Sequence, residues 1–482
     1  MQLNSLIFLL FFSIVFVLYY CRSKVKWQNA LLLVASYFFY GYIDWKMLPL
    51  IIAMTLLFYY VGAIIGKLRE RGEDKKAQLL STILIIVGLL PLLYFKYFNF
   101  FVESVSDFLG IIGLHDTTRT LNILMPLGIS FFTFRLISYA IEVNRMKMKP
   151  TKDLVAFAAY VAFFPTILSG PIDRPANFLG QISEGRKPDY QYLYKGIILF
   201  VWGWFIKVCI ADRIAKYTGA IFDVYDTANG ASLVIASLLY PFEMYADFSG
   251  YSCMAIGVGK MLGIDVAENF RRPFFAQNIA EYWRRWHMSL TSWLTDYVFM
   301  PLNVKFRNLG NWGIIFAAII NMIVVGFWHG DNWTYGFFGL YHGLLFIPIV
   351  LSGNLGKKKK VKWLNGWMLP PKVLLNMVLT YLLVAIGLVF FRAPSVAVGF
   401  DILHGIVSSW GVPSTPDVMN IIIFVFFGLI LIVKDYLDEN NSKWRMLNTE
   451  RTFSTNLTLF ILIICIILFR ADVPKPFVYI QF

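Results

Sequence analysis

The stretch "SLIFLLFFSIVFVLYY" (residues 5–20) contains no charged side chain, and comparable hydrophobic runs recur as far as "NLTLFILIICIILF" (456–469). A helix needs roughly 20 mostly apolar residues to cross a bilayer, and we count about 11–13 hydrophobic segments of this kind. Of the 482 residues, 58% are hydrophobic and 15% are charged, whereas a soluble protein carries about 25% charged residues. The sequence therefore predicts an all-α polytopic membrane protein. The first run is interpreted as a retained span and not as a cleaved signal peptide.

The positive charge is confined to short segments beside the hydrophobic runs. The net charge is +14, and its main clusters are "CRSKVK" (21–26), "KLRERGEDKK" (67–76), "RMKMKPTK" (145–152) and "KKKKVK" (357–362). This distribution is typical of cytoplasmic loops and does not form a continuous surface for nucleic acid. The four cysteines lie in or beside apolar runs without the spacing of metal ligands, so we expect no metal site.

Placing the basic clusters in the cytoplasm predicts that both chain termini are extracytoplasmic. We expect one integral-membrane domain over 1–482, since the sequence shows no soluble domain and no internal repeat. Its predicted parts are N-terminal spans (1–120), a catalytic core (121–352), C-terminal spans (353–470) and an extracytoplasmic tail (471–482).

Proline and glycine interrupt three apolar segments, "MPLGISFF" (125–132), "FFPTILSGPI" (163–172) and "DFSGYS" (247–252). Broken helices are tolerated at membrane depth only where they face protein or a wet cavity. We therefore expect helix breaks inside the protein at these places.

Residues 277–300, "QNIAEYWRRWHMSLTSWLTDYVFM", are predicted to form one amphipathic helix. Its expected aromatic stripe consists of Trp283, Trp286, Leu290, Trp293 and Tyr297. Glu281 is four residues before Arg285 and is expected to pair with it. His287 lies at the edge of the stripe and is expected to point into protein or lipid. The simplest interpretation is an interfacial helix on the cytoplasmic face.

The stretch "VVGFWHGDNWTYGFFGLYHG" (324–343) places His329 and His342 at the ends of adjacent apolar runs. An ionisable residue at membrane depth is costly and usually functional. A histidine can take a proton from a hydroxyl group and return it near neutral pH, so His329 is a candidate general base. The residues alone leave open a structural histidine or a proton-coupling residue of a transporter or flippase.

These segments together resemble the membrane-bound O-acyltransferase (MBOAT) family, in particular its bacterial branch that O-acetylates alginate and other cell-envelope polysaccharides. The resemblance is carried by 126–145, 163–182, 245–302, and "FWHG" (327–330) followed by "GLYHG" (339–343). It implies an MBOAT fold, with re-entrant and amphipathic helices around a central tunnel. It implies that His329 is the catalytic histidine and that His287 is a second functional histidine. The residues expected to line the tunnel are Trp328, Asp247, Tyr251 and His342.

The C-terminal "PFVYIQF" (476–482) also resembles the ending of many members of this branch. The resemblance implies that Tyr479 carries the acyl group, with its aromatic neighbours bound in an apolar groove. A phenol has a pKa of about 10, so Tyr479 would need a base such as His329 to attack a thioester. The alternative is that the tail is only an interfacial aromatic anchor.

The expected donor is acetyl-CoA or another acyl thioester from the cytoplasm. The predicted donor-binding residues are Arg284, Arg285, Trp286 and Ser289, the arginines contacting CoA phosphates or, alternatively, lipid phosphates or other helices. The expected partners are an extracytoplasmic SGNH-type acyltransferase, a cell-envelope polysaccharide and the lipids of a bacterial inner membrane. D-alanyl transfer to teichoic acid from a carrier protein is an alternative. Cys253, where the polysaccharide acetylases often carry Asp, slightly weakens the assignment to acetyl, whereas the length and "RRWHMSLTSWL" (284–294) favour the acetylase side.

Overall fold

The computed structural model describes residues 1–113, 120–357, 363–441, 446–447, 452–470 and 477. Within these ranges the regular structure is helical, apart from one isolated bridge between Leu364 and Met368. The predicted all-helical class is confirmed. Contacts divide the chain into unit 1 (Met1–Ile197 and Met254–Ala267) and unit 2 (Ile198–Cys253 and Glu268–Phe482).

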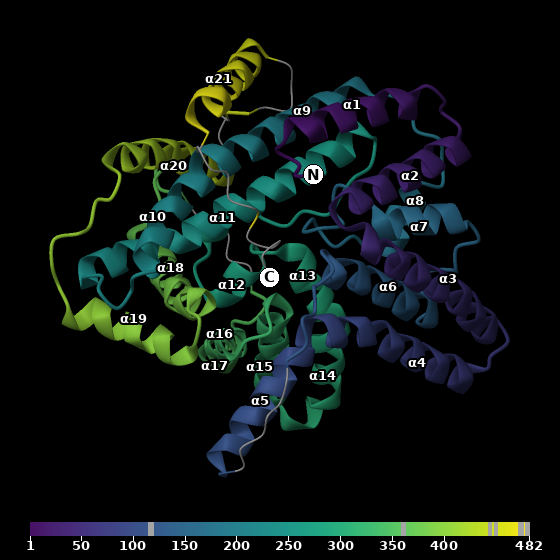
Figure 1. Cartoon of the computed structure of the whole chain (residues 1–482), viewed down its shortest axis with the longest axis horizontal. Coiled ribbons are helices and arrows are strands. Elements are labelled where there is room, and N and C mark those ends of the chain that lie inside the picture. Colours follow the sequence, from purple (N-terminus) through teal and green to yellow (C-terminus); the bar gives the residue numbers. More distant parts are fainter. Residues whose placement is uncertain (114–119, 358–362, 442–445, 448–451, 471–476, 478–482) are drawn as a thin grey trace. The chain divides into compact units, whose positions relative to one another are not determined.

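The helices of unit 1 pack both against sequence neighbours and against distant ones. They are α1 (Leu6–Tyr20), α2 (Val25–Asp44), η1 (Trp45–Met47), α3 (Leu48–Glu70), α4 (Asp74–Leu92), η2 (Leu93–Tyr97), α5 (Phe98–Ile111), α6 (Ile129–Asn144), α7 (Leu154–Ala162) and α8 (Pro175–Gln181). Helix α3 packs against its neighbour α4, and α2 packs against the distant α7. Helices α3, α4 and α6 contact one another, and Figure 1 shows them in blue and purple. Two helices, α9 (Tyr190–Phe205) and α11 (Gly230–Met261), contain residues of both units.

Unit 2 holds the remaining helices, in which α15 and α16 form a closely packed pair and α18 contacts α16 (Figure 1). Its elements are η3 (Ile206–Ala211), α10 (Asp212–Phe222), η4 (Pro273–Phe275), α12 (Ile279–Trp283), α13 (Met288–Leu294), η5 (Thr295–Phe299), α14 (Met300–Lys305), η6 (Arg307–Leu309), α15 (Asn311–His329), α16 (Trp333–Leu344), α17 (Ile347–Leu351), α18 (Pro371–Arg392), α19 (Val396–Ser408), α20 (Val418–Glu439) and α21 (Phe453–Phe469).

The outer surfaces of the apolar helices are suited to lipid. In the described residues, six helical segments are long and apolar enough to cross a membrane: Val25–Glu70, Asp74–Ile111, Asn311–His329, Trp333–Leu351, Pro371–Arg392 and Val418–Glu439. Shorter apolar helices such as α1 and α21 expose large side chains, including Leu6 (74%) and Leu468 (67%). Such exposure is unfavourable in water and favourable in hydrocarbon. The chain is a multi-pass membrane protein, while the sidedness of its termini stays a prediction.

The predicted break at "FFPTILSGPI" is confirmed. Residues 163–172 leave the helical conformation between α7 and α8, and all of them are buried. Arg135 of α6 is 1% exposed and donates from Nη1 to the carbonyl oxygens of Tyr160 (3.1 Å) and Val161 (3.0 Å). Its Nη2 donates to Thr166 Oγ1. The guanidinium thus satisfies backbone groups that a broken helix would otherwise leave without partners.

The break at "MPLGISFF" is also confirmed. Gly128 precedes α6 with φ 73°, a left-handed conformation that glycine adopts without steric cost. A Cβ atom at this position would strike the carbonyl oxygen of Ile167 in the broken segment. The two interrupted stretches therefore support each other within unit 1.

The expected break at "DFSGYS" is wrong, because α11 continues through it without interruption. Gly250 serves close packing instead. A Cβ atom at Gly250 would lie 2.9 Å from the carbonyl oxygen of Gly203 and 3.3 Å from the Cβ atom of Lys207. The absence of a side chain here lets α11 approach η3, so the pattern indicates a helix contact and not a turn.

The buried arginine of unit 1 generates a stability prediction. Replacing Arg135 by Met removes the donors of three buried oxygens, and each unsatisfied acceptor costs about 1–3 kcal/mol. We expect Arg135→Met to lower the apparent melting temperature of the detergent-purified protein by several degrees, measured by scanning fluorimetry. Arg71→Met, at an exposed position, is the control and should change it little. Equal melting temperatures for both variants would contradict this role of Arg135.

Candidate active site

The segment 277–300 is not a single amphipathic helix, which corrects the sequence-based prediction. The short helix α12 ends at Trp283, His287 has the left-handed conformation (φ 43°, ψ 50°), and α13 begins at Met288. From Thr295 the chain forms the π-helix η5. The predicted aromatic stripe therefore does not lie on one helix face. A left-handed conformation costs a non-glycine residue about 1 kcal/mol or more and often marks a functional site.

Asn269 binds the two residues that follow the His287 turn. Its carbonyl oxygen accepts from the backbone N–H of Met288 (2.8 Å), and its Oδ1 accepts from the hydroxyl of Ser289 (2.5 Å). Its Nδ2 donates to Ser252 Oγ of α11 (3.0 Å). Asn269 is fully buried. These bonds fix the strained backbone, so Asn269 is a supporting residue that the sequence reasoning missed, although "ENF" (268–270) lies within the diagnostic block.

The turn brings the two predicted histidines together. The ring centroids of His287 and His329 are 6.3 Å apart, and the two side chains are 0% and 3% exposed. Phe248 packs edge-on against His287 at 4.6 Å. Trp328 lies 5.3 Å from the ring of His287 and 5.0 Å from that of His329. Two imidazoles that are 42 residues apart in the chain thus share one aromatic enclosure.

The two histidines differ in their local environments. Burial lowers the pKa of His287 to about 3, so its imidazole is neutral at pH 7 and is a weak base. His329 is the last residue of α15, where the negative end of the helix dipole favours a cation. This contrast suits His287 for orienting a reacting group by a hydrogen bond and His329 for accepting a proton.

His342, predicted to line a tunnel, belongs to the aromatic shell behind His329. Its Nδ1 accepts from Trp283 Nε1 at 3.3 Å, which places the proton of the neutral ring on Nε2. Phe338 separates the two histidines, with ring centroids 4.6 Å from His342 and 6.4 Å from His329. The tunnel itself stays a prediction.

The predicted residues Asp247 and Tyr251 lie on α11, on either side of Phe248. Asp247 is 2.5 Å from Nζ of Lys207, a buried lysine that our sequence reasoning overlooked. The signal was present, because Lys207 interrupts the apolar run "LFVWGWFIKVCIA" (199–211), and ionisable residues in such runs are usually functional. Tyr479 lies outside the described residues.

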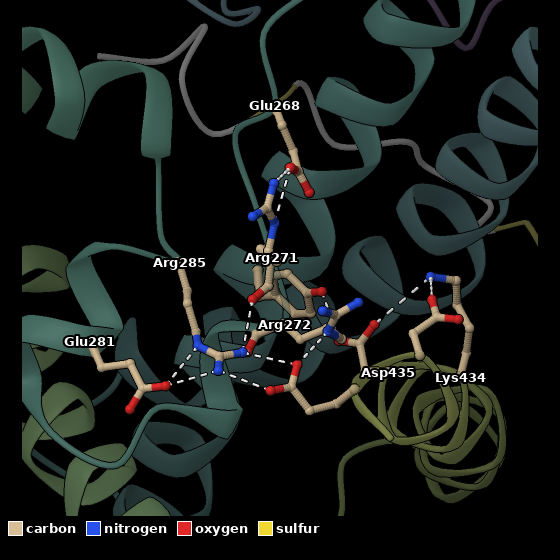
Figure 2. Close-up of polar contacts among 10 residues, drawn as sticks. Glu268, Arg271, Arg272, Glu281, Arg285, Lys434 and Asp435 are labelled. Atoms are coloured by element: carbon tan, nitrogen blue, oxygen red, sulfur yellow. Dashed lines mark hydrogen bonds and ion pairs between the residues drawn. The ribbon is translucent and has the colours of Figure 1, made fainter. Parts of the chain in front are cut away.

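Arg285 is committed to carboxylates of the protein. Its Nη2 is 2.8 Å from Glu281 Oε1 and 2.9 Å from Glu439 Oε1, and its Nη1 donates to Glu439 Oε2 at 3.0 Å. Figure 2 shows this guanidinium between Glu281 and Arg272. Arg272 Nε also binds Glu439, at 2.6 Å from Oε2. The predicted Glu281–Arg285 pair is confirmed. Glu439, from α20, makes Arg285 an internal link of unit 2.

The other predicted donor-binding residues divide into two kinds. Trp286 is 4% exposed, stacks on Tyr282 (5.4 Å) and packs edge-on against Phe270 (5.0 Å), and Ser289 is bound to Asn269. Both therefore support the turn. Arg284 is half-buried, and its guanidinium forms no ion pair with any residue that the structure describes. Of the two arginines, Arg284 is thus the one available to an anionic ligand.

No group of three or more His, Cys, Asp or Glu side chains within the described ranges is arranged to hold a metal ion.

The part of the chain that contains the two histidines matches a known protein family. The model of the membrane-bound O-acyltransferase family, MBOAT, matches residues 7–362. The probable alginate O-acetylase AlgI of Pseudomonas aeruginosa is 35% identical over 446 residues, covering 89% of this chain and 82% of that protein. The peptidoglycan O-acetyltransferase of Helicobacter pylori is 30% identical, covering 79% and 74%. The teichoic acid D-alanyltransferase of Bacillus subtilis is 32% identical, covering 64% and 76%.

The adjacent arginines allow a matched stability test. Arg285→Gln leaves Glu281 without its cation and Glu439 with Arg272 alone, and removing one partner of a buried ion pair costs about 3–5 kcal/mol. We expect this variant to lower the apparent melting temperature clearly, and Arg284→Gln to leave it nearly unchanged. Thermal unfolding followed by tryptophan fluorescence would measure both. A larger loss for Arg284→Gln than for Arg285→Gln would refute the assignment of their roles.

Proposed function

Because this chain belongs to the membrane-bound O-acyltransferase family, we propose that it moves an acetyl group from a cytoplasmic thioester to the outer face of a bacterial inner membrane. There the group is used to O-acetylate a cell-envelope polysaccharide. The chain is a multi-pass membrane O-acyltransferase. The observation that carries the proposal is the enclosed pair of His287 and His329, 6.3 Å apart within the region of the family match.

In the first transfer, His329 acts as general base on the hydroxyl of Tyr479. The phenol oxygen attacks the carbonyl carbon of the thioester, and a new C–O bond forms as the C–S bond breaks. His329 then returns the proton to the departing thiolate, so the products are a tyrosyl ester and a free thiol. The position of His329 at the end of α15 supports this role, because the helix dipole favours its protonated state during the transfer.

His287 orients the reaction and does not take the proton. Its neutral imidazole can hold one hydrogen bond to the thioester or to the phenol, and such fixed dipoles stabilise developing charge in a dry site. The left-handed turn and the bonds of Asn269 keep the ring in place. Aromatic neighbours exclude water, which would otherwise hydrolyse the activated acyl group.

The second transfer takes place outside the membrane. An aryl ester is activated because phenolate, with a pKa of about 10 for its acid, leaves more readily than an alkoxide. A partner of the SGNH acyltransferase type would attack the tyrosyl ester, break its C–O bond and return the proton to Tyr479. The partner would then esterify a hydroxyl group of the polysaccharide. The names of the Pseudomonas and Helicobacter relatives support acetyl as the group and a cell-envelope polysaccharide as acceptor.

The Bacillus relative supports a second candidate, the transfer of D-alanine to teichoic acid. The chemistry at Tyr479 would be the same, but the donor would be a charged carrier protein in place of acetyl-CoA. A reconstituted assay with either donor separates the two candidates. The alternative of a transporter or flippase is set aside by membership in an enzyme family.

The central test is mass spectrometry of the C-terminal peptide after incubation with acetyl-CoA. We expect the wild-type protein to gain one acetyl group on Tyr479 and the Tyr479→Phe variant to gain none. His329→Ala should reduce the acetylated fraction by at least a hundredfold, since general base catalysis contributes about 10²–10⁴. If the protein is active while Tyr479 stays unmodified, the acyl-carrier role is wrong and transfer runs directly to a partner.

Arg284 generates a separate prediction about the donor. A hydrogen bond from a guanidinium to a phosphate contributes about 1.5–3 kcal/mol, so Arg284→Gln should raise the KM for acetyl-CoA at least tenfold with little change in kcat. Arg271→Gln is the control, because Arg271 is exposed and already pairs with Glu268. An unchanged KM for Arg284→Gln would remove this residue from the donor site.

A further inference from the structure

A buried lysine in unit 2 has no part in the chemistry described above. Lys207 Nζ lies 2.5 Å from Asp247 Oδ1 and 2.8 Å from Asp212 Oδ1. All three side chains are at most 3% exposed. Burying charged groups is expensive even when they are paired, and such a cluster at membrane depth usually has a function. The question is what this cluster holds.

The local structure is built for this cluster. Lys207 and Asp212 are five residues apart, a spacing that places side chains on different sides of an α-helix. The chain over Ile206–Ala211 is a π-helix instead, and its wider turn brings residues five apart to the same side. π-Helical turns cost stability and are frequent at functional sites. Gly250 allows α11, with Asp247, to approach this turn closely.

The ring of Phe477 sits on the cluster. Lys207 Nζ lies 4.6 Å from the ring centroid, a cation–π distance. Tyr251 of α11 packs edge-on against the same ring at 4.8 Å. Phe477 is 2% exposed. The cluster therefore binds a residue of the C-terminal segment, Phe477.

The same stretch of chain also holds the beginning of the tail. Arg213, next to Asp212, donates from Nε and Nη2 to the carbonyl oxygen of Phe469 (3.2 and 3.0 Å). Its Nη2 also donates to the carbonyl oxygen of Arg470 (3.0 Å). These bonds satisfy carbonyl groups at the end of α21 that have no partner within the helix. Residues 207–213 thus contact the chain on both sides of 471–476.

We infer that Lys207, Arg213 and Tyr251 form a tail clamp, which holds the C-terminal segment at Phe469–Arg470 and at Phe477. Lys207 is a positioning residue for the acyl-transfer reaction, acting through the ring of Phe477. Asp212 and Asp247 hold its ammonium group in place. The inference rests on the proposed role of Tyr479, which it deepens by assigning the residues that place that tyrosine.

The position of the clamp relative to the histidines supports this inference. Tyr251 lies one helical turn after Phe248, and Phe248 contacts the ring of His287. Contacts therefore run without interruption from Phe477 through α11 to the histidine pair. Tyr479 follows Phe477 by two residues, which span at most about 7 Å. A chain that is held at Phe477 therefore cannot carry the backbone of Tyr479 far from the clamp.

The test changes the ring and leaves the buried charges intact, because substitution of Lys207 would remove the cation that two buried carboxylates share. Phe477→Leu keeps an apolar side chain and removes the π face, whereas Phe477→Trp keeps the π face. The full-length protein in nanodiscs is compared by hydrogen exchange of the C-terminal peptide, by acetyl occupancy of Tyr479 and by thermal unfolding.

We expect Phe477→Leu to speed exchange of the C-terminal peptide at least tenfold and to lower the rate of Tyr479 acetylation at least tenfold. Its KM for acetyl-CoA should be unchanged, and the loss of buried ring contacts should lower its melting temperature by a few degrees at most. Phe477→Trp should keep more of the exchange protection and of the Tyr479 acetylation rate than Phe477→Leu does, because it retains a π face although its ring is larger. Arg213→Gln, which releases the other end, should also speed exchange of the peptide.

The outcomes separate the clamp from the proposed function. If the C-terminal peptide of Phe477→Leu exchanges its amide hydrogens, and Tyr479 is acetylated, as fast as in the wild-type protein, the clamp is refuted while Tyr479 remains the carrier. If exchange depends on Phe477 but Tyr479 is never acetylated in active protein, the clamp stands as a docking site and the carrier role fails. If Phe477→Trp loses protection as fully as Phe477→Leu, the cation–π role of Lys207 is refuted.

Discussion

The left-handed turn at His287 is the constraint on which the candidate site depends. A helix through 277–300 would spread its aromatic and polar residues over two faces and leave His287 at an interface. The turn instead withdraws the ring from the surface and places it beside His329. The strain is balanced by Asn269, whose backbone and side chain bind the two residues that follow the histidine. The residues that follow the histidine, held by Asn269, thus help to fix the orientation of its ring.

Charge burial follows a common rule in unit 2. Arg285 lies between two carboxylates, and Lys207 lies between two others, so each buried cation is shared and each has partners from distant parts of the chain. Such pairing limits the desolvation cost but does not abolish it. The two clusters differ in whether their charged groups also contact another part of the chain. The first is satisfied within itself, whereas the second presents its ammonium to an aromatic ring of the C-terminal segment.

Backbone groups in the apolar interior also need polar partners. In unit 1 the broken segment between α7 and α8 is buried, and Arg135 supplies donors to the last carbonyl oxygens of α7 and to the hydroxyl of Thr166. In unit 2 Arg213 does so at the end of α21. An arginine can serve several oxygens at once because its guanidinium carries five donors in a fixed plane. Irregular backbone can therefore exist where lipid surrounds the protein, provided such a side chain reaches it.

The sequence by itself determined the features that depend on composition and on near neighbours. Hydropathy established a helical membrane protein, proline and glycine marked the breaks at 125–132 and 163–172, and the four-residue spacing predicted the Glu281–Arg285 pair. His329 was singled out because ionisable residues are rare in apolar runs, and His287 because its segment resembles the acyltransferase family. These inferences succeed because helix geometry and transfer free energy are local properties of the chain.

Only the tertiary structure decided which distant groups meet. Glu439 reaches Arg285 across 154 residues, and Asp247 reaches Lys207 across 40, and no local pattern encodes either pairing. The same holds for the turn at His287, where a bond from Asn269 overrides the helical periodicity of 277–300. At Gly250 the sequence suggested a break in the helix. The structure instead shows a continuous helix that packs closely against η3 at this residue. Long-range contacts outweigh local propensity since each is worth as much as several residues' conformational preference.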